Sequence, residues 1–197
     1  MKETCSEHIA GCSRYSSPPI FAWLSDVSSV FDPVLPGGSQ LRAYWRAPEG
    51  SALALALVQA ARKHPGLLVA VTADTHAAHA LETELHVFAD PGLPILHLPD
   101  WETLPYDVFS PHSEIVAARI ATLYRLPSLT RGVLVVPVST LMQRVTPKRW
   151  LSGQSLVLKV GQKFDLDAEK RMLEAAGYRH VPQVFEPGDY ATRGALL

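Results

Sequence analysis

The sequence lacks the features of a secreted or membrane-bound protein. It has only two cysteines, Cys5 and Cys12, and a disulfide between them would close only a short polar segment. Two free thiols in a reducing compartment are the simpler interpretation. No apolar run reaches the ~18 residues that a bilayer span requires, and the N-terminus has no basic segment followed by an apolar core. These absences predict a cytoplasmic protein.

An excess of charge of one sign is also missing. The 197 residues include 18 Lys and Arg against 19 Asp and Glu, which gives a formal net charge of -1. Such a chain has no global positive field to hold nucleic acid, so any contact of that kind would be local or supplied by a partner. A hydrophobic content of 47% with 19% charged residues is typical of a globular chain. The length predicts one domain, or one and a part.

The elements of a nucleotide site are incomplete. The candidate phosphate loop covers residues 48–53, where a helix is predicted to begin. A working loop needs flexible glycines, a lysine for the phosphates and a Ser or Thr for magnesium. This segment has one glycine, Gly50, no lysine, and an acidic Glu49 that would repel phosphate. The residues favour an ordinary helix start with Ser51 as its cap, and they predict no nucleotide cofactor in this chain.

Three histidines share a predicted helix with an acidic residue. His79 and Glu82 are spaced i, i+3, and His79 and His86 are spaced i, i+7, so they lie on one side, with His76 nearby. A metal site needs three or four convergent ligands. Solvated helix histidines are therefore the favoured interpretation, and the sequence predicts no metal site.

Candidates for catalysis are weak. Asp100, Glu102 and Asp107 could form a carboxylate pair for acid–base chemistry, but nothing in the sequence brings them together, and two prolines restrict their loop. No Gly-x-Ser-x-Gly nucleophile motif occurs. Ser139 and Thr140 follow an apolar run and are most simply helix caps. We therefore predict no catalytic group in this chain.

The chain does contain strand-like segments alternating with helix-like segments. Residues 132–138 form a continuous apolar run, typical of a strand buried on both faces of a parallel sheet. Further strands are predicted at residues 41–46, 67–72 (also buried) and 94–98, and helices at 52–63, 74–88, 110–126 and 139–145. In the third helix, Ser110 is the expected cap, Pro111 the first residue, and Arg119 lies at the margin of the apolar face. The order predicts an α/β fold with a doubly wound parallel sheet over residues 41–150.

The pattern changes on either side of this lobe. Residues 1–40 are rich in Ser, Pro and Gly and predict a poorly ordered leader, with at most one short helix at residues 20–24. Residues 151–197 predict part of a small α+β unit. It has a strand at 155–160, a helix from Asp165 or Asp167 to Gly177 with Leu173 and Ala176 inward, and strands at 178–181 and from Tyr190.

Two arginines flank the short strands of this unit. Isolated arginines such as Arg179 and Arg193 are most often solvated. Arginine is also a favoured anchor in protein interfaces. The pattern alone leaves both alternatives open.

Several segments resemble the N-terminal part of the bacterial transcription-repair coupling factor family. The longest are Asp-Trp-Glu-Thr-Leu-Pro-Tyr-Asp at residues 100–107 and Tyr-Ala-Thr-Arg-Gly-Ala-Leu-Leu at residues 190–197. The others are residues 109–112, 131–138, 140–145 and 176–181. These segments run in the family's order from about residue 41 to the end, and residues 1–40 have no counterpart.

The resemblance implies a fold and a partner. It implies a degenerate RecA-like lobe without a phosphate loop, similar to the first domain of UvrB, at residues 41–150. An incomplete UvrA-interaction domain would follow at residues 151–197. Arg193 corresponds to a residue of the family's UvrA contact surface, and Arg179 is its neighbour. The family's ATP- and Mg-dependent translocase, and its contacts with RNA polymerase and double-stranded DNA, belong to regions outside this chain.

The implied function is recruitment of UvrA to a stalled RNA polymerase in transcription-coupled nucleotide excision repair, without catalysis in this chain. Two alternatives remain. A nucleotide-binding helicase lobe would bind ATP saturably. A truncated remnant would bind nothing, because its second domain is incomplete.

Overall fold

The computed structural model describes residues 30–38, 41–45, 50–104, 106–153, 160–194 and 196–197. The helix predicted at residues 20–24 and nearly all of the strand predicted at 155–160 lie outside the described residues. Among the described residues, no helix combines the length and the apolar character that crossing a bilayer would require. Part of the predicted leader contacts the body of the protein, because Lys63 Nζ donates hydrogen bonds to Asp32 and to the carbonyl of Pro33.

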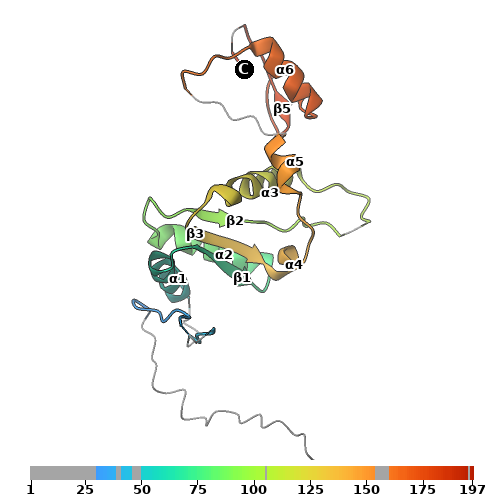
Figure 1. Cartoon of the computed structure of the whole chain (residues 1–197). Coiled ribbons are helices and arrows are strands. Elements are labelled where there is room, and N and C mark those ends of the chain that lie inside the picture. Colours follow the sequence, from blue (N-terminus) through green and yellow to red (C-terminus); the bar gives the residue numbers. More distant parts are fainter. Residues whose placement is uncertain (1–29, 39–40, 46–49, 105, 154–159, 195) are drawn as a thin grey trace, which may run out of the picture.

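The centre of the fold is a parallel sheet of three strands in the order β1-β3-β2. Strand β1 is Leu67–Thr72, β2 is Ile95–His97 and β3 is Gly132–Pro137. Both outer strands pair with β3 in parallel register, with Leu67 opposite Gly132 and Ile95 opposite Val133. The predicted α/β class with a parallel sheet is confirmed (Figure 1).

The strand predicted at residues 41–46 is wrong over the part that the structure describes, because residues 41–45 have no strand conformation. Leu41 and Tyr44 are mostly exposed. The indole of Trp45 donates to the carbonyl of Val34 at 2.8 Å instead of packing on the sheet. The alternating pattern of residues 41–45 therefore does not correspond to a buried face of a strand.

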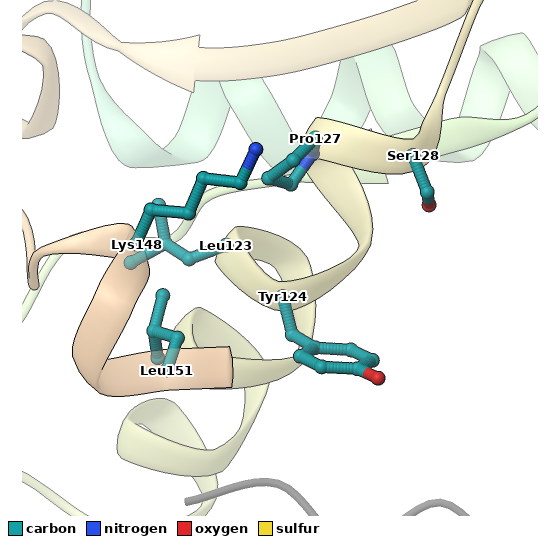
Figure 2. Close-up of a pocket in the computed structure, with 6 residues that line it drawn as sticks. All are labelled: Leu123, Tyr124, Pro127, Ser128, Lys148 and Leu151. Atoms are coloured by element: carbon teal, nitrogen blue, oxygen red, sulfur yellow. The ribbon is translucent and has the colours of Figure 1, made fainter. Parts of the chain in front are cut away.

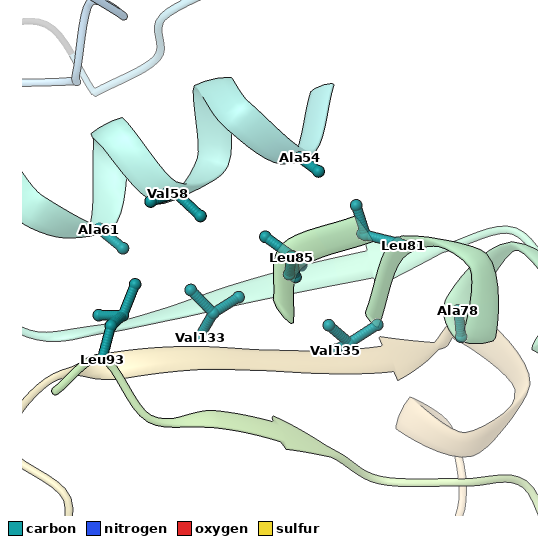
Figure 3. Close-up of a cluster of buried hydrophobic side chains, with 10 residues drawn as sticks. Ala54, Val58, Ala61, Ala78, Leu81, Leu85, Leu93, Val133 and Val135 are labelled. Atoms are coloured by element: carbon teal, nitrogen blue, oxygen red, sulfur yellow. The ribbon is translucent and has the colours of Figure 1, made fainter. Parts of the chain in front are cut away.

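Helices cover both faces of the sheet. Helices α1 (Ala52–Lys63) and α2 (Thr75–Phe88) pack on one face, and α3 (Ser113–Arg125), followed by the 3-10 turn η2 (Leu126–Ser128), packs on the other (Figure 1). The larger apolar core lies under α1 and α2 and contains Ala54, Val58, Ala61, Ala70, Ala78, Leu81, Leu85, Leu93, Val133 and Val135 (Figure 3). The smaller core lies under α3 and contains Leu96, Leu98, Leu134 and Val136.

The two cores explain the composition of β3. Its side chains alternate between the faces, with Val133 and Val135 in the larger core and Leu134 and Val136 in the smaller one. All six residues of β3 are buried, which confirms the prediction from its continuous apolar run.

Strand β1 forms where predicted but is not buried on both faces. Val69 and Val71 are 48% and 51% exposed. Since β1 is an edge strand, Ala70 and Leu68 pack into the larger core, and on the α3 side only Leu67 packs against the smaller core. The prediction that β1 is buried on both faces was therefore wrong for the face on the α3 side, where Val69 and Val71 are exposed.

The helix ends agree with the sequence for α1 and α2 but not for α3. Asp74 caps α2 by accepting a hydrogen bond from Ala77 N at 2.7 Å. Ser51 occupies the N-cap position of α1 as predicted, but its hydroxyl makes no capping hydrogen bond. Helix α3 begins at Ser113, with His112 Nδ1 accepting from Glu114 N. The predicted cap, Ser110, and first residue, Pro111, were thus each two residues early.

Two short helices follow β3. Helix α4 is Val138–Leu141 and α5 is Lys148–Gly153. The helix predicted at residues 139–145 was too long, and its N-cap position is occupied by Pro137, so Ser139 and Thr140 are not caps.

The C-terminal unit contains α6 (Leu166–Ala175) and two short parallel strands, β4 (Arg179–His180) and β5 (Asp189–Tyr190). Asp165 caps α6 by accepting from Asp167 N and Ala168 N, both at 3.1 Å. Leu173 is buried as predicted, but Ala176 is exposed because it lies past the end of the helix.

Candidate functional site

The described part of the candidate phosphate loop is a simple helix start. Gly50 has φ +56, and its carbonyl accepts a hydrogen bond from Leu53 N at 3.3 Å. Residues 48 and 49 lie outside the described residues. The Ser51 hydroxyl makes no capping hydrogen bond.

A hydrogen-bonded network occupies the carboxyl edge of the sheet. Asp100 follows β2, and its Oδ2 accepts from Ser139 Oγ at 2.5 Å and from Thr140 Oγ1 at 3.2 Å, both from the start of α4. Gln143 Nε2 donates to Asp100 Oδ1 at 3.4 Å, and Glu102 N donates to the same oxygen at 3.3 Å. Ligands of doubly wound sheets bind at this edge. In this chain, Asp100 fills its hydrogen-bonding capacity with side chains that follow the neighbouring strand.

The Asp100 carboxyl is held in its charged form. Burial raises its pKa, but the hydrogen bonds from Ser139, Glu102 N, Thr140 and Gln143 lower it more, so the pKa lies below the ordinary value. The Asp107 carboxylate instead accepts from Leu104 N at 2.7 Å within its own loop. Asp100 is therefore a structural acceptor, and the described contacts do not join it to Glu102 or Asp107 as an acid–base pair.

Arg119 is buried rather than marginal, which corrects the prediction. Only 2% of the residue is exposed, and its guanidinium donates to the carbonyl of Pro99 and lies 4.1 Å from the centre of the Trp101 ring. Burial lowers the pKa of Arg119, and the charge of Asp100 opposes that effect. Because these contacts come from a loop distant in sequence, the helical pattern alone did not reveal them. Arg119 and the Asp100 network together hold residues 99–102 against the lobe.

The loop beyond this anchor carries exposed apolar side chains. Leu104, Tyr106, Val108 and Phe109 are each at least 75% exposed. Tyr106 also has a positive φ of +75, which is uncommon outside glycine. The segment most specific to the resemblance therefore has an anchored base and an apolar, solvent-exposed tip.

A histidine–carboxylate cluster lies between α2 and the end of β2. Glu82 Oε2 is 2.8 Å from His97 Nδ1 and 3.8 Å from His79 Nδ1. The rings of His79 and His97 meet edge to face, with 4.7 Å between their centroids. The hydrogen bond from His97 lowers the pKa of Glu82; burial opposes this, and the charges of His97, His79 and His86 add to the lowering. One potential metal-ligand atom from each of the three side chains lies within 4.8 Å of the other two.

The sequence indicated only half of this cluster. The predicted proximity of His79 and Glu82 is confirmed, but His76 and His86 do not join them, and His97 comes from another element. Strand alternation was the available signal, because it places His97 on the same side of β2 as Ile95, which packs against the larger core.

A pocket of about 260 Å³ lies apart from both sites. It is lined by residues of α3, η2 and α5, namely Leu123, Tyr124, Pro127, Ser128, Lys148 and Leu151 (Figure 2). Its lining is mainly apolar, and it contains no residue of the Asp100 network or of the histidine cluster.

The two candidate interface arginines differ in their surroundings. Arg179 pairs with Asp189 at 2.9 Å and with Glu186 at 3.8 Å, and the Asp189 side chain is only 6% exposed. Arg193 is exposed, and its side chain makes no hydrogen bond or ion pair with the described residues. Its backbone exchanges two hydrogen bonds with Leu196, at 3.0 and 3.1 Å. The structure therefore ties Arg179 to its own unit and presents Arg193 on a closed turn.

Comparisons with known proteins found related sequences. No protein-family model matches the chain. The chain is 51% identical over 148 residues to the transcription-repair-coupling factor of Escherichia coli (strain K12), an alignment that covers 75% of this chain and 13% of that protein. The protein of the same name from Haemophilus influenzae is 44% identical over 144 residues, covering 73% of this chain and 12% of that protein.

A more distant relative gives the same result. The transcription-repair-coupling factor of Mycobacterium tuberculosis is 35% identical over 151 residues, covering 72% of this chain and 12% of that protein. The chain thus spans about an eighth of the length of the curated relatives it matches.

Proposed function

Because this chain belongs to the transcription-repair-coupling factor family, we propose that it acts as an adaptor that binds UvrA. In the whole protein, this region would recruit UvrA to a stalled RNA polymerase and so direct nucleotide excision repair to the lesion. We assign ATP- and Mg-dependent movement on double-stranded DNA to parts of such proteins outside this chain. The proposed mechanism here is surface recognition without chemistry.

The proposed lobe is a degenerate RecA-like domain of the kind found in UvrB. Its support is the parallel α/β sheet together with the composition of the candidate phosphate loop, which has Gly50 but no lysine. The side chains at the carboxyl edge also bind one another, since Asp100 accepts from Ser139 and Thr140 where a ligand would otherwise be held. These features favour an adaptor over a nucleotide-dependent motor.

The proposed UvrA contact depends on one observation, namely that the Arg193 side chain is exposed and has no partner among the described residues. A guanidinium has five donors and matches carboxylates and carbonyls well, and charge-assisted hydrogen bonds are stronger than neutral ones. Arg193 has no side-chain partner among the described residues, and its turn is closed by backbone hydrogen bonds to Leu196. We propose that it binds an acidic or carbonyl group of UvrA. Arg179, already paired with Asp189, would support the turn-bearing unit and touch UvrA only secondarily.

The test is a titration of UvrA in a calorimeter. It uses this chain beside a longer one that extends past residue 197. In the longer chain, Arg193→Ala is expected to weaken UvrA binding by ~1–3 kcal/mol, or about 5- to 150-fold, as for an interface anchor. The matched control is Arg171→Ala, which removes another exposed arginine from the same unit.

The results of the titration distinguish the anchor role of Arg193 from the adaptor function of the chain. An unchanged dissociation constant for Arg193→Ala in the longer chain would remove the anchor role. Absence of UvrA binding by the longer native chain would overturn the adaptor proposal itself. Binding by the longer chain alone would support the adaptor function and show that residues 151–197 are insufficient.

A further inference from the structure

The cluster of His79, Glu82 and His97 has no part in the proposed adaptor function. Its members come from α2 and β2, and their side chains are graded in exposure, at 58% for His79, 27% for Glu82 and 8% for His97. The cluster therefore has one buried end and one end open to solvent.

The buried end is chemically incomplete. His97 Nδ1 faces the Glu82 carboxylate at 2.8 Å, but its other ring nitrogen, Nε2, is buried and has no hydrogen-bond partner among the described residues. An ion bound beside Glu82 would be held at Nδ1 and would leave Nε2 without a partner, so the Nδ1 geometry is what points to a ligand. The His97 ring also contacts the His79 ring directly, which joins the three side chains in one cluster.

His97 occupies a position at which an apolar side chain would suffice for packing. It shares a face of β2 with Ile95, whose side chain packs against the larger core. An apolar side chain at this position would need no polar partner, whereas the imidazole has one in Glu82 at Nδ1. Thr122 Oγ1 donates to the His97 carbonyl at 2.7 Å, which fixes the backbone that carries the ring.

The spacing of the three side chains suits a small metal ion. Zn–N and Zn–O bonds of about 2.0–2.2 Å at tetrahedral angles place ligand atoms roughly 3.3 Å apart. The Glu82 Oε2 distances of 2.8 Å to His97 and 3.8 Å to His79 lie on either side of that value. The three ligand atoms lie within 4.8 Å of one another, so the exposed His79 side chain would move toward the other two to reach tetrahedral spacing.

We propose that His79, Glu82 and His97 bind one divalent ion of the zinc class, with a fourth position open to water. Two imidazoles and one carboxylate suit zinc and its transition-metal neighbours, whereas magnesium and calcium prefer sites made of oxygen alone. The ion would join the middle of α2 to the carboxyl end of β2. This proposal is independent of the UvrA contact, since none of its residues lies in the C-terminal unit.

The test uses the whole chain without a histidine tag and with Cys5→Ser and Cys12→Ser, so that no thiol or tag competes for the ion. Zinc alone is titrated by calorimetry, and cobalt(II) is titrated by visible absorption, which reports ligand type and geometry directly. We expect one ion per chain, cobalt bands of a nitrogen- and oxygen-ligated site, and a melting temperature that rises with zinc concentration. Magnesium should give none of these effects.

Matched variants locate the site. His79→Ala removes an exposed side chain, so the fold should persist, and we expect zinc affinity to fall about tenfold or more. His97→Asn should abolish binding if the variant folds. The controls are His86→Ala and His76→Ala, which remove exposed histidines of the same helix and should change the affinity far less than His79→Ala does.

Two results would overturn the proposal. One is a native chain that binds no zinc saturably. The other is an affinity that falls equally in His79→Ala and in the two control variants, because zinc would then be held by scattered surface histidines.

Discussion

Replacing Asp100 by alanine tests the structural role of the network at the carboxyl edge. The change removes the acceptor for the hydroxyls of Ser139 and Thr140, for the Gln143 amide and for the backbone N–H of Glu102. It should leave the strands in place, because none of these groups belongs to the sheet. The expected result is a less stable lobe with a looser loop after β2.

The magnitude follows from the donors that water cannot reach. Ser139 is exposed and can exchange its hydrogen bond for one to water, so its loss costs little. Thr140 is 1% exposed, and an unsatisfied buried hydroxyl costs ~1–3 kcal/mol. Arg119 is 2% exposed and would lose the opposite charge of Asp100. Together these effects predict a loss of about 3 kcal/mol in the free energy of unfolding, the upper end of the cost of an unsatisfied buried hydroxyl, because the lost attraction on Arg119 adds to it.

The assay is urea unfolding followed by circular dichroism. With a denaturant slope of ~1–3 kcal/mol per molar, the loss should lower the midpoint by ~1–3 M. Asp107→Ala is the matched control, because that carboxylate accepts a single hydrogen bond from Leu104 N in the exposed loop. Equal midpoints for the two variants would refute the reasoning that the Asp100 network supports the lobe.

Three further predictions concern pH, backbone geometry and nucleotide. Hydrogen bonds hold the pKa of Asp100 below its ordinary value of about 3.9, so its stabilising contribution should be full above that pH and be lost as the pH falls through the lower folded-state pKa. The difference in unfolding free energy between the native chain and Asp100→Asn, measured by urea unfolding, should therefore shrink in acid. Gly132→Ala should destabilise the lobe by ~2 kcal/mol or more in a melting experiment, since φ is +145 and the new Cβ would lie 2.7 Å from the Pro94 carbonyl oxygen. The control Gly92→Ala should have little effect, because no atom lies within 4 Å of the Cβ added there. Equilibrium dialysis should detect no saturable ATP retention by this chain, and retention that saturates would favour the helicase-lobe alternative.

The elements with a strong local signal were predictable. Helix α2 lies where it was predicted, and Asp165, one of the two residues at which α6 was expected to begin, is its cap. Strand β3 was identified from an apolar run that only a central parallel strand can bury. The failures fell where local signals were ambiguous, as at residues 41–45, whose alternation does not correspond to a buried face.

The site residues divide in the same way. The helical spacing of His79 and Glu82 was readable because residues three apart on one helix are neighbours by geometry. Their contact with His97 was not readable, because it depends on how α2 lies across β2. The burial of Arg119 likewise depends on the path of residues 99–101, which no period in the helix encodes.

The sequence by itself determined the α/β class, the order of the helices and strands from α1 to α4, and the burial of β3, because each is set by periodicity and composition within one segment. Only the tertiary structure decided that Ser139 and Thr140 bind Asp100, and that His97 completes a cluster with His79 and Glu82. Those contacts join side chains from different elements. They arise from the register that sets β2 and β3 side by side and from the packing of α2 on the sheet, and neither leaves a mark in the residues of one segment.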